Sequence, residues 1–213
     1  MGFMAFYQDV KNKFELGPLQ HMTSIQNFES ILKLGSLFAK NKVIQLGTTI
    51  VDISNEDVQK GRALKNVPGT ALTLHDFVPL YWGRRTPMSF VNQERNEEII
   101  FLRYSADVLP KYDCYLTDGN AYDSKSNFCK FGQLGDISIV DSKAVNAWYF
   151  NEIPDGKRLK QAEVLVFEQL PNSDILDIVC LNDRVKAQIL DILARHGKKI
   201  AVNVNSNFYV VKK

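Results

Sequence analysis

Two segments of the chain carry apolar residues at helical spacing. The first, residues 27–41, has its apolar positions at Phe28, Ile31, Leu32 and Leu34. Gly35 is a suitable C-cap for it, and Ser24 or Asn27 would cap the other end. The second segment runs from Asp183, which opens it, to Gly197, which closes it, with apolar positions at Val185, Ile189, Ile192 and Leu193. Such a stripe is typical of a helix that packs on a core, so both segments are predicted to be amphipathic helices.

Short apolar runs predict that most of the remaining elements are strands. They cover residues 97–105, 113–122, 157–170, 174–182 and 198–211. Residues 70–82 begin as a further strand, which Pro79 interrupts before the chain turns at Gly83. Residues 55–69 are polar with a breaker at each end, and residues 123–153 contain only short irregular pieces. No regular element is predicted in these last two segments.

The strand predicted over residues 157–170 carries a carboxylate. Counted by twos, both of its faces are mostly apolar, as expected for a strand with neighbours on both sides. Glu163 interrupts this pattern, and an unpaired charge in such a place is costly. Glu163 is therefore either the partner in a structural ion pair or a group that lines a cleft where its charge is used. Gln161 would leave the same face, so an amide and a carboxylate could act on one ligand.

The order of these elements predicts an α+β fold, strand-rich with flanking helices. Strands and helices do not alternate as the parallel units of a Rossmann fold require, and no glycine-rich phosphate loop follows a strand. The 213 residues contain no internal repeat, low-complexity tract or flexible linker, so a single domain is predicted.

Composition bears on compartment and metal chemistry more than on function. No stretch approaches the roughly 20 apolar residues that span a bilayer, so no membrane is expected as a partner. The cysteines lack metal-ligand spacing and favour a reduced, cytoplasmic compartment; they are Cys114, Cys129 and Cys180. The three histidines are far apart in sequence, and no metal site is expected. The net charge of +2 neither demands nor excludes a nucleic-acid partner.

Three polar residues lie in surroundings that suggest a ligand. His21 lies where an extended segment runs into the first helix, which suits either a nucleotide ribose or a satisfied core histidine. Arg62 lies beside a turn, where a guanidinium either faces solvent or donates to a diphosphate or a buried carboxylate. His75 has aromatic neighbours that form either core or a platform for flat rings, namely Phe77, Tyr81 and Trp82.

Taken in order, these motifs resemble the DarT-type DNA ADP-ribosyltransferase toxins. HMTSIQNFESILKLGSLFAKN (21–41) is similar to the family's opening histidine-x-threonine segment and the helix after it. The most specific stretch combines VP at 67–68 with LHDFVPLYWGRRTPM at 74–88. LTDGNA (116–121) is similar to the family's phenylalanine-threonine-aspartate turn, and KQAEVLV (160–166) to its QAE-aliphatic-LV strand. The resemblance extends from about residue 21 to Phe208-Tyr209.

The resemblance implies a site. Arg62 and Glu163 match the family's catalytic pair. NAD would be held by His21, Met22, Thr23, Ser30 and Phe38, together with Arg62. Residues 1–213 would form one ADP-ribosyltransferase domain: about 1–18 an N-terminal extension, about 44–65 an element that folds over NAD, and about 123–163 a loop that reads the substrate. The sequence departs from the family where Ser30 replaces a common glycine and in the substrate loop, which matches poorly apart from Trp148.

Contacts to nucleic acid are expected from residue type and neighbourhood. Aromatic rings stack on unpaired bases, and basic side chains bind phosphates. The candidates are Tyr81, Trp82, Arg84, Arg85, Trp148 and Lys160.

The family's chemistry predicts a toxin enzyme that transfers ADP-ribose from NAD to a base in single-stranded DNA and releases nicotinamide. Thymine is favoured as the target, and guanine is the other base used within the family. NAD is expected as co-substrate, and a macrodomain antitoxin that reverses the modification is expected as partner. Two alternatives stay open: an ADP-ribosyltransferase of the same fold acting on RNA or protein, and an inactive relative that binds a nucleotide or a partner protein.

Overall fold

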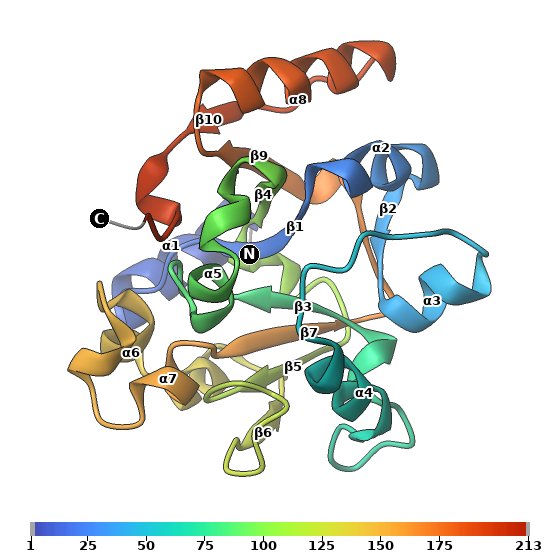
Figure 1. Cartoon of the computed structure of the whole chain (residues 1–213). Coiled ribbons are helices and arrows are strands. Elements are labelled where there is room, and N and C mark those ends of the chain that lie inside the picture. Colours follow the sequence, from blue (N-terminus) through green and yellow to red (C-terminus); the bar gives the residue numbers. More distant parts are fainter. Residues whose placement is uncertain (1–2, 212–213) are drawn as a thin grey trace.

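The centre of the protein is an eight-stranded mixed sheet with the strand order β10-β9-β4-β1-β3-β7-β5-β6 (Figure 1). The computed structural model describes residues 3–211. The strands of the sheet are β1 (Leu19–Ser24), β3 (Phe77–Tyr81), β4 (Ile99–Tyr104), β5 (Cys114–Thr117), β6 (Phe128–Lys130), β7 (Glu163–Phe167), β9 (Ile175–Cys180) and β10 (Val202–Val204). A second, two-stranded sheet pairs β2 (Ser36–Phe38) with β8 (Gln169–Pro171). The predicted fold class, a strand-rich mixture with flanking helices, is confirmed.

Eight α-helices are described within residues 3–211: α1 (Phe3–Phe14), α2 (Ile25–Leu34), α3 (Lys40–Gln45), α4 (Glu56–Leu64), α5 (Pro87–Val91), α6 (Ser142–Asn146), α7 (Gly156–Leu159) and α8 (Asp183–Arg195). The two predicted amphipathic helices correspond to α2 and α8. Ser24 caps α2 by accepting from the Gln26 N–H, and Gly35 ends it at φ 77°. α8 is capped by Asn182 instead of Asp183, because the Asn182 side chain accepts from the Val185 N–H.

The polar segment 55–69, for which no element was predicted, folds into helix α4. Asn55 caps this helix by accepting from the N–H groups of Asp57 and Val58. Arg62 is the only residue of α4 that is buried, so this helix needs no apolar stripe. A helix that buries one charged residue carries no hydrophobic periodicity, and this is why the pattern did not reveal it.

Three further predictions of elements need correction. The strand expected from residue 157 begins only at Glu163, because residues 156–159 form the short helix α7. Residues 123–153 are less irregular than predicted, since they contain strand β6 and helix α6. Helix α8 connects β9 to β10, which lie parallel, so the fold contains one parallel β-α-β unit although none was expected.

The sheet opens between β1 and β3, and this opening positions the functional site. β1 pairs with β4 over six residues but with β3 only at Gln20 and Tyr81. β3 in turn pairs along its full length with β7, and Pro79 lies inside this strand opposite Leu165. The predicted interruption at Pro79 is therefore wrong. Pro79 has no N–H, but no hydrogen bond of the sheet is lost. Its nitrogen lies on the edge of β3 that faces β1, and β1 has already diverged from β3 at this point.

Candidate active site

A cavity of about 590 Å³ lies where β1 and β3 diverge. The residues predicted to hold the cofactor all line it: His21, Met22 and Thr23 from β1, Ser30 from α2, Phe38 from β2 and Arg62 from α4. Its volume falls within the range of about 300–1,000 Å³ that is common for ligand and cofactor sites. The structure therefore brings six residues that are spread over more than 40 positions into one cavity.

His21 is held as a neutral imidazole at this cavity. Its Nδ1 lies 2.9 Å from the carbonyl oxygen of Pro79, the group that the diverging strands leave without a ladder partner. Burial lowers the pKa of His21, which outweighs the opposite effect of the Pro79 carbonyl. Nδ1 therefore carries the proton that is donated to Pro79, and Nε2 has a lone pair that can accept from a ligand hydroxyl.

Arg62 and Glu163 form a buried bidentate ion pair. Nη2 of Arg62 donates to Oε2 of Glu163 at 2.9 Å, and Nη1 donates to Oε1 at 3.2 Å. The side chain of Glu163 has no exposed surface, and that of Arg62 is 8% exposed. Burial disfavours the charged guanidinium, but the adjacent carboxylate of Glu163 outweighs it and the pKa of Arg62 is raised. Arg62 lines the cavity and Glu163 lies behind it.

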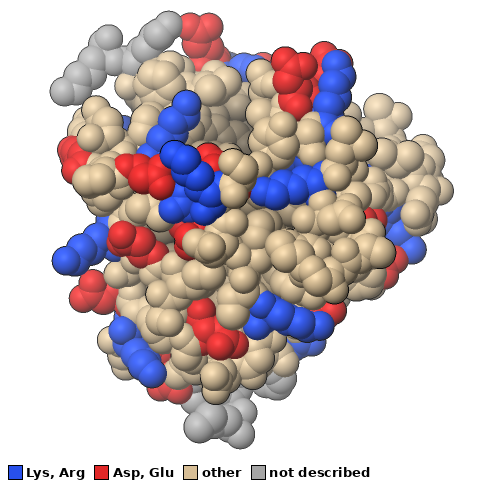
Figure 2. Space-filling model, turned by 90° about the horizontal axis from the view of Figure 1, so that it is seen from below, with Lys and Arg blue, Asp and Glu red and all other residues tan. Residues whose placement is uncertain are grey.

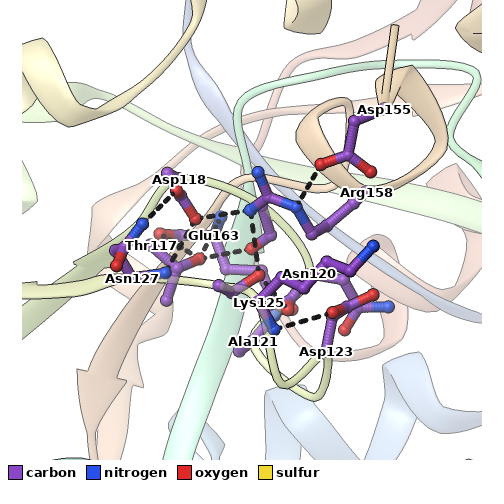
Figure 3. A network of polar contacts seen from close by, with 12 residues as sticks. Thr117, Asp118, Asn120, Ala121, Asp123, Lys125, Asn127, Asp155, Arg158 and Glu163 are labelled. Atoms are coloured by element: carbon purple, nitrogen blue, oxygen red, sulfur yellow. Dashed lines mark hydrogen bonds and ion pairs between the residues drawn. The ribbon is translucent and has the colours of Figure 1, made fainter.

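A loop between β5 and β6 completes the surroundings of Glu163 (Figure 3). The backbone N–H of Ala121 donates to Oε1 of Glu163 at 2.8 Å. On the other side, the Glu163 N–H donates to Oγ1 of Thr117 at 3.0 Å, and this hydroxyl donates to the carbonyl of Gly119. Ala121 was not singled out from the sequence, because a backbone donor carries no signal in residue type.

Arg158 fastens this loop to the rest of the site (Figure 3). Its Nη1 donates to Asp118 at 2.7 Å, and its Nε donates to Asp155 at 2.6 Å. The carbonyl of Arg158 accepts from the Asn120 N–H at 3.0 Å. A Cβ at Gly119 would lie 2.7 Å from Nη1 of Arg158, so only glycine allows the close approach of loop and arginine. Arg158 therefore holds the loop that carries the Ala121 N–H at two points, through its side chain at Asp118 and through its carbonyl at Asn120.

An irregular segment, residues 46–55, covers the cavity and is held by two asparagines. Asn27 donates from Nδ2 to the carbonyl of Val51 at 2.9 Å and accepts from the Val51 N–H at 2.7 Å. Asn92 donates to the carbonyl of Ile53 at 3.0 Å. Asn27, which the sequence offers as a helix cap, instead fixes the backbone of a segment that lines the cavity.

The family model described as "ssDNA thymidine ADP-ribosyltransferase, DarT" matches residues 20–210. The chain belongs to the DarT family. The family predicted from the sequence motifs is confirmed, and with it the activity class, an NAD-dependent ADP-ribosyltransferase that acts on single-stranded DNA.

Two relatives and two solved structures show how far the likeness extends. A DNA ADP-ribosyl transferase of Thermus sp. (strain 2.9) is 30% identical over 203 residues, which is 90% of this chain and 95% of that protein. A DNA ADP-ribosyl transferase of Escherichia coli O127:H6 is 28% identical and covers 81% of this chain and 84% of its own length. The structure of Thermus sp. 2.9 DarT in complex with ADP-ribosylated ssDNA has a TM-score of 0.84 at 28% identity, covering 92% of this chain and 97% of that chain. The same protein in complex with NAD+ gives a TM-score of 0.78, covering 92% of this chain and 98% of that chain.

Four of the six residues predicted to contact DNA in this DarT-family chain reach the surface or the cavity. Tyr81 lines the cavity opposite Glu163 in the β3–β7 ladder, and burial together with the charge of Glu163 raises the pKa of its phenol. Arg84 and Trp148 are exposed. The guanidinium of Arg85 lies 4.3 Å from the centre of the Trp148 ring. Arg85 therefore holds this indole at the surface by a cation–π contact.

Trp82 and Lys160, the other two candidates, are buried and do not face solvent. The ammonium of Lys160 donates to the carbonyls of Val145 and Ala147, in the segment that precedes the exposed Trp148. Burial, and then the charges of Arg84 and Arg85, lower the pKa of Lys160 to about 8. Its position corrects the prediction of a phosphate contact: Lys160 anchors the loop that displays Trp148.

The remaining candidates have structural partners. His75 is buried, with Nε2 2.9 Å from Oε1 of Gln59, and burial and the charges of Lys40 and Arg62 lower its pKa to about 4. Gln161 lines the cavity but precedes strand β7, and its side chain donates to the carbonyl of Lys157. Within residues 3–211, no cluster of three His, Cys, Asp or Glu side chains is arranged to bind a metal ion. No helix in the same range is both long and apolar enough to cross a membrane.

Proposed function

We propose that this protein transfers ADP-ribose from NAD to thymine in single-stranded DNA, with Arg62 and Glu163 as the catalytic pair. The observation that carries the proposal is the meeting of these two side chains at the wall of the cavity that collects the predicted cofactor residues. Thymine is the base that the family description names. The DNA complex of the Thermus sp. relative supports the choice of a single strand.

In the proposed reaction the bond between nicotinamide and ribose breaks, and the nicotinamide nitrogen keeps the electron pair. The ribose carbon then bonds to a ring nitrogen of the base, and this nitrogen loses its proton. Once Arg62 has moved away from it, Glu163 would accept that proton and stabilise the positive charge that develops on the ribose. A single strand suits this chemistry, because the pairing edge of a base is hidden in a duplex and its extrusion costs a few kcal/mol.

The other side chains of the cavity would bind and orient the substrates. The lone pair on Nε2 of His21 can accept from a ribose hydroxyl, since Nδ1 is already committed to Pro79. The Arg62 guanidinium supplies two donors that suit the diphosphate, and its withdrawal toward a phosphate would uncover Glu163. Ser30, at a position where the family commonly has glycine, is among the residues that line the cavity.

The proposal is tested by incubating the protein with NAD and with separate pools of DNA, RNA and protein. We expect ADP-ribose mass to be gained only by the DNA pool, and only by single strands that contain thymine. Oligonucleotides that differ in one base identify the target by mass spectrometry. Mass gain in the RNA or protein pool, or on guanine, would replace the proposed substrate. Nicotinamide release that is as fast for E163Q as for the unchanged protein would overturn the catalytic role of Glu163.

The biological setting follows as part of the same proposal. A bulky adduct on single-stranded DNA blocks replication, so the enzyme would act as a toxin in the cytoplasm, where the three free cysteines are stable. A macrodomain antitoxin that hydrolyses the base–ribose linkage would protect the host. Adding such a macrodomain to the modified oligonucleotide should return its original mass, and an unchanged adduct would exclude this partner.

A further inference from the structure

A second groove of about 770 Å³ adjoins the catalytic cavity. Lys65, Tyr122 and Phe128 are among its lining residues. Asn120 and Asp123 line both the groove and the cavity, so the two spaces are continuous at this loop. The cofactor residues of β1 and β2 line only the cavity. The groove could thus take a part of a ligand that extends from the cavity past Asn120 and Asp123, away from the predicted cofactor residues.

Tyr122 is the most distinctive feature of this groove. A Cβ at Gly61 of α4 would overlap the ring of Tyr122 at Cζ and Cε2, so the ring rests on the helix backbone where a glycine leaves room. Even so, Tyr122 is 38% exposed. Its backbone N–H donates to Oδ1 of Asn120, which fixes the start of the side chain. An aromatic ring with one side supported and another side open is a preformed platform for a flat ligand.

The platform lies directly beside the catalytic pair. Gly61 precedes Arg62, and Tyr122 follows Ala121, whose N–H donates to Glu163. Tyr122 and the glycine that supports it are therefore each next in sequence to a residue that belongs to the catalytic pair or contacts it. A base stacked on Tyr122 would belong to a nucleotide next to the one being modified.

Positive charge accompanies the ring. Lys65 follows Gly61 by one helical turn; its ammonium donates to the carbonyl of Asp123 at 2.9 Å and lies 5.4 Å from the centre of the Phe128 ring. The carboxylate of Asp123 is turned to its own loop, where it accepts from the Lys125 N–H at 2.9 Å. On the face seen in Figure 2, Lys and Arg side chains lie near the middle with Asp and Glu side chains among them. The Lys65 ammonium in the groove is therefore the charge that suits a phosphate of a single strand.

We propose that this groove is a subsite for the nucleotide adjacent to the target base, with Tyr122 stacking on its base and Lys65 close to its phosphate. The inference rests on the proposed DNA substrate and adds a second place where the strand is held. Stacking on an aromatic ring tolerates every base, so the subsite contributes affinity without requiring a particular sequence.

The test measures kcat and KM for a thymine-containing single strand with Y122A, Y122F and the unchanged protein. Loss of one stacked base should raise the KM of Y122A about tenfold, with kcat at saturating DNA within about twofold. Y122F should behave like the unchanged protein, because the ring is retained. F167A is the matched control, since Phe167 is also 38% exposed but lies at the other end of strand β7. An unchanged KM for Y122A, or an equal rise for F167A, would overturn the subsite.

A second measurement locates the stacked nucleotide. An abasic residue is moved along the oligonucleotide one position at a time. When the abasic residue occupies the position that stacks on Tyr122, kcat/KM should fall about tenfold for the unchanged protein. It should not fall for Y122A, because this variant has already lost the stacking contact. Equal losses in both proteins at every position would overturn the inference. If the unchanged protein modifies no DNA at all, the proposed function fails, and this result differs from an active enzyme that ignores Tyr122.

Discussion

The carboxylate of Glu163 is covered by the guanidinium of Arg62. Both oxygens of Glu163 accept from Arg62, at 3.2 and 2.9 Å, and the carboxylate has no exposed surface. In this arrangement the acid cannot reach a proton on a base, and Arg62 has to shift first. The pair is thus both a structural ion pair and the proposed catalytic centre, and its two roles can be separated by experiment.

The first prediction concerns this pair. E163Q should lower the rate by a factor on the order of 100–1,000, because a preorganised charge is lost. It should also destabilise the fold by about 3–5 kcal/mol, because the Arg62 charge stays buried without a partner. The double variant R62M/E163Q removes both charges and should recover most of the unfolding free energy while it stays inactive. Urea denaturation and nicotinamide release measure the two effects. Recovery of activity in the double variant would contradict the catalytic role.

A second prediction concerns the Arg158–Asp118 contact. R158Q and D118N both loosen the loop that brings the Ala121 N–H to Glu163. Because this N–H orients the carboxylate, loosening the loop should lower kcat about tenfold in both variants, while KM for NAD stays within about twofold.

The control for this experiment is R103Q, which breaks the Arg103–Asp177 pair between β4 and β9. R103Q should lower stability without changing kcat. A loss of kcat in R158Q alone would show that Arg158 contacts the substrate directly, since Asp118 does not line the cavity.

A third prediction concerns the cover of the cavity. N27A removes both hydrogen bonds to Val51 and should raise KM for NAD about tenfold, since each such bond contributes about 1 kcal/mol and the segment above the cavity is freed. N96A is the control, because Asn96 also donates to a backbone carbonyl, that of Val210, away from the cavity. Equal KM values for NAD in both variants would show that Asn27 does not hold the cover.

A fourth prediction concerns Lys160. K160M leaves the carbonyls of Val145 and Ala147 without their donor, so the loop that displays Trp148 should be cut faster by protease and KM for DNA should rise. K157M, which changes an exposed lysine nearby, should leave the rate of cleavage unaltered. The pKa of Lys160 is lowered to about 8, so above this pH the neutral amine keeps its N–H donors but loses its charge and should anchor the loop more weakly. A KM for DNA that does not respond to K160M would refute this role.

A fifth prediction concerns stability in mild acid. The pKa of His75 is lowered to about 4 in the folded protein, from an ordinary value of 6.5. Between these values the unfolded chain binds a proton that the folded protein does not, so the free energy of unfolding should fall as the pH drops, by up to about 1.4 kcal/mol per pH unit. H75Q should reduce this slope in urea titrations from pH 7 to 4. The slope that remains would include His21, whose pKa is also lowered by burial.

How much of the molecule could be predicted depends on the range of the interactions involved. Helices α2 and α8 were predicted because apolar spacing and end signals are local. Helix α4 was not, because its only buried residue is Arg62, whose partner lies 101 positions away. The meeting of Arg62 and Glu163 was expected only through the likeness to a family, since spacing in sequence cannot show it. The Ala121 N–H and the Asn27 contact depend on backbone geometry, which residue types do not encode.

The burial of Lys160 could not be predicted from the sequence either, because it depends on how separate segments pack together. A lysine beside a strand is usually solvated, whereas Lys160 packs close to Gly83 and its ammonium is buried against the carbonyls of Val145 and Ala147. Pro79 was read as an interruption for a similar reason: its effect depends on which edge of β3 has a neighbour, and this is a property of the whole sheet.

Since β1 leaves β3 after a single residue pair, residues 21–23 of β1 border the cavity without a strand partner on that side within the described part of the protein. An unpaired strand edge offers amides and carbonyls whatever the side chains are. Recognition by such an edge tolerates substitutions, so proteins that share only 26–30% of their residues can preserve one binding geometry while the rest of the surface diverges.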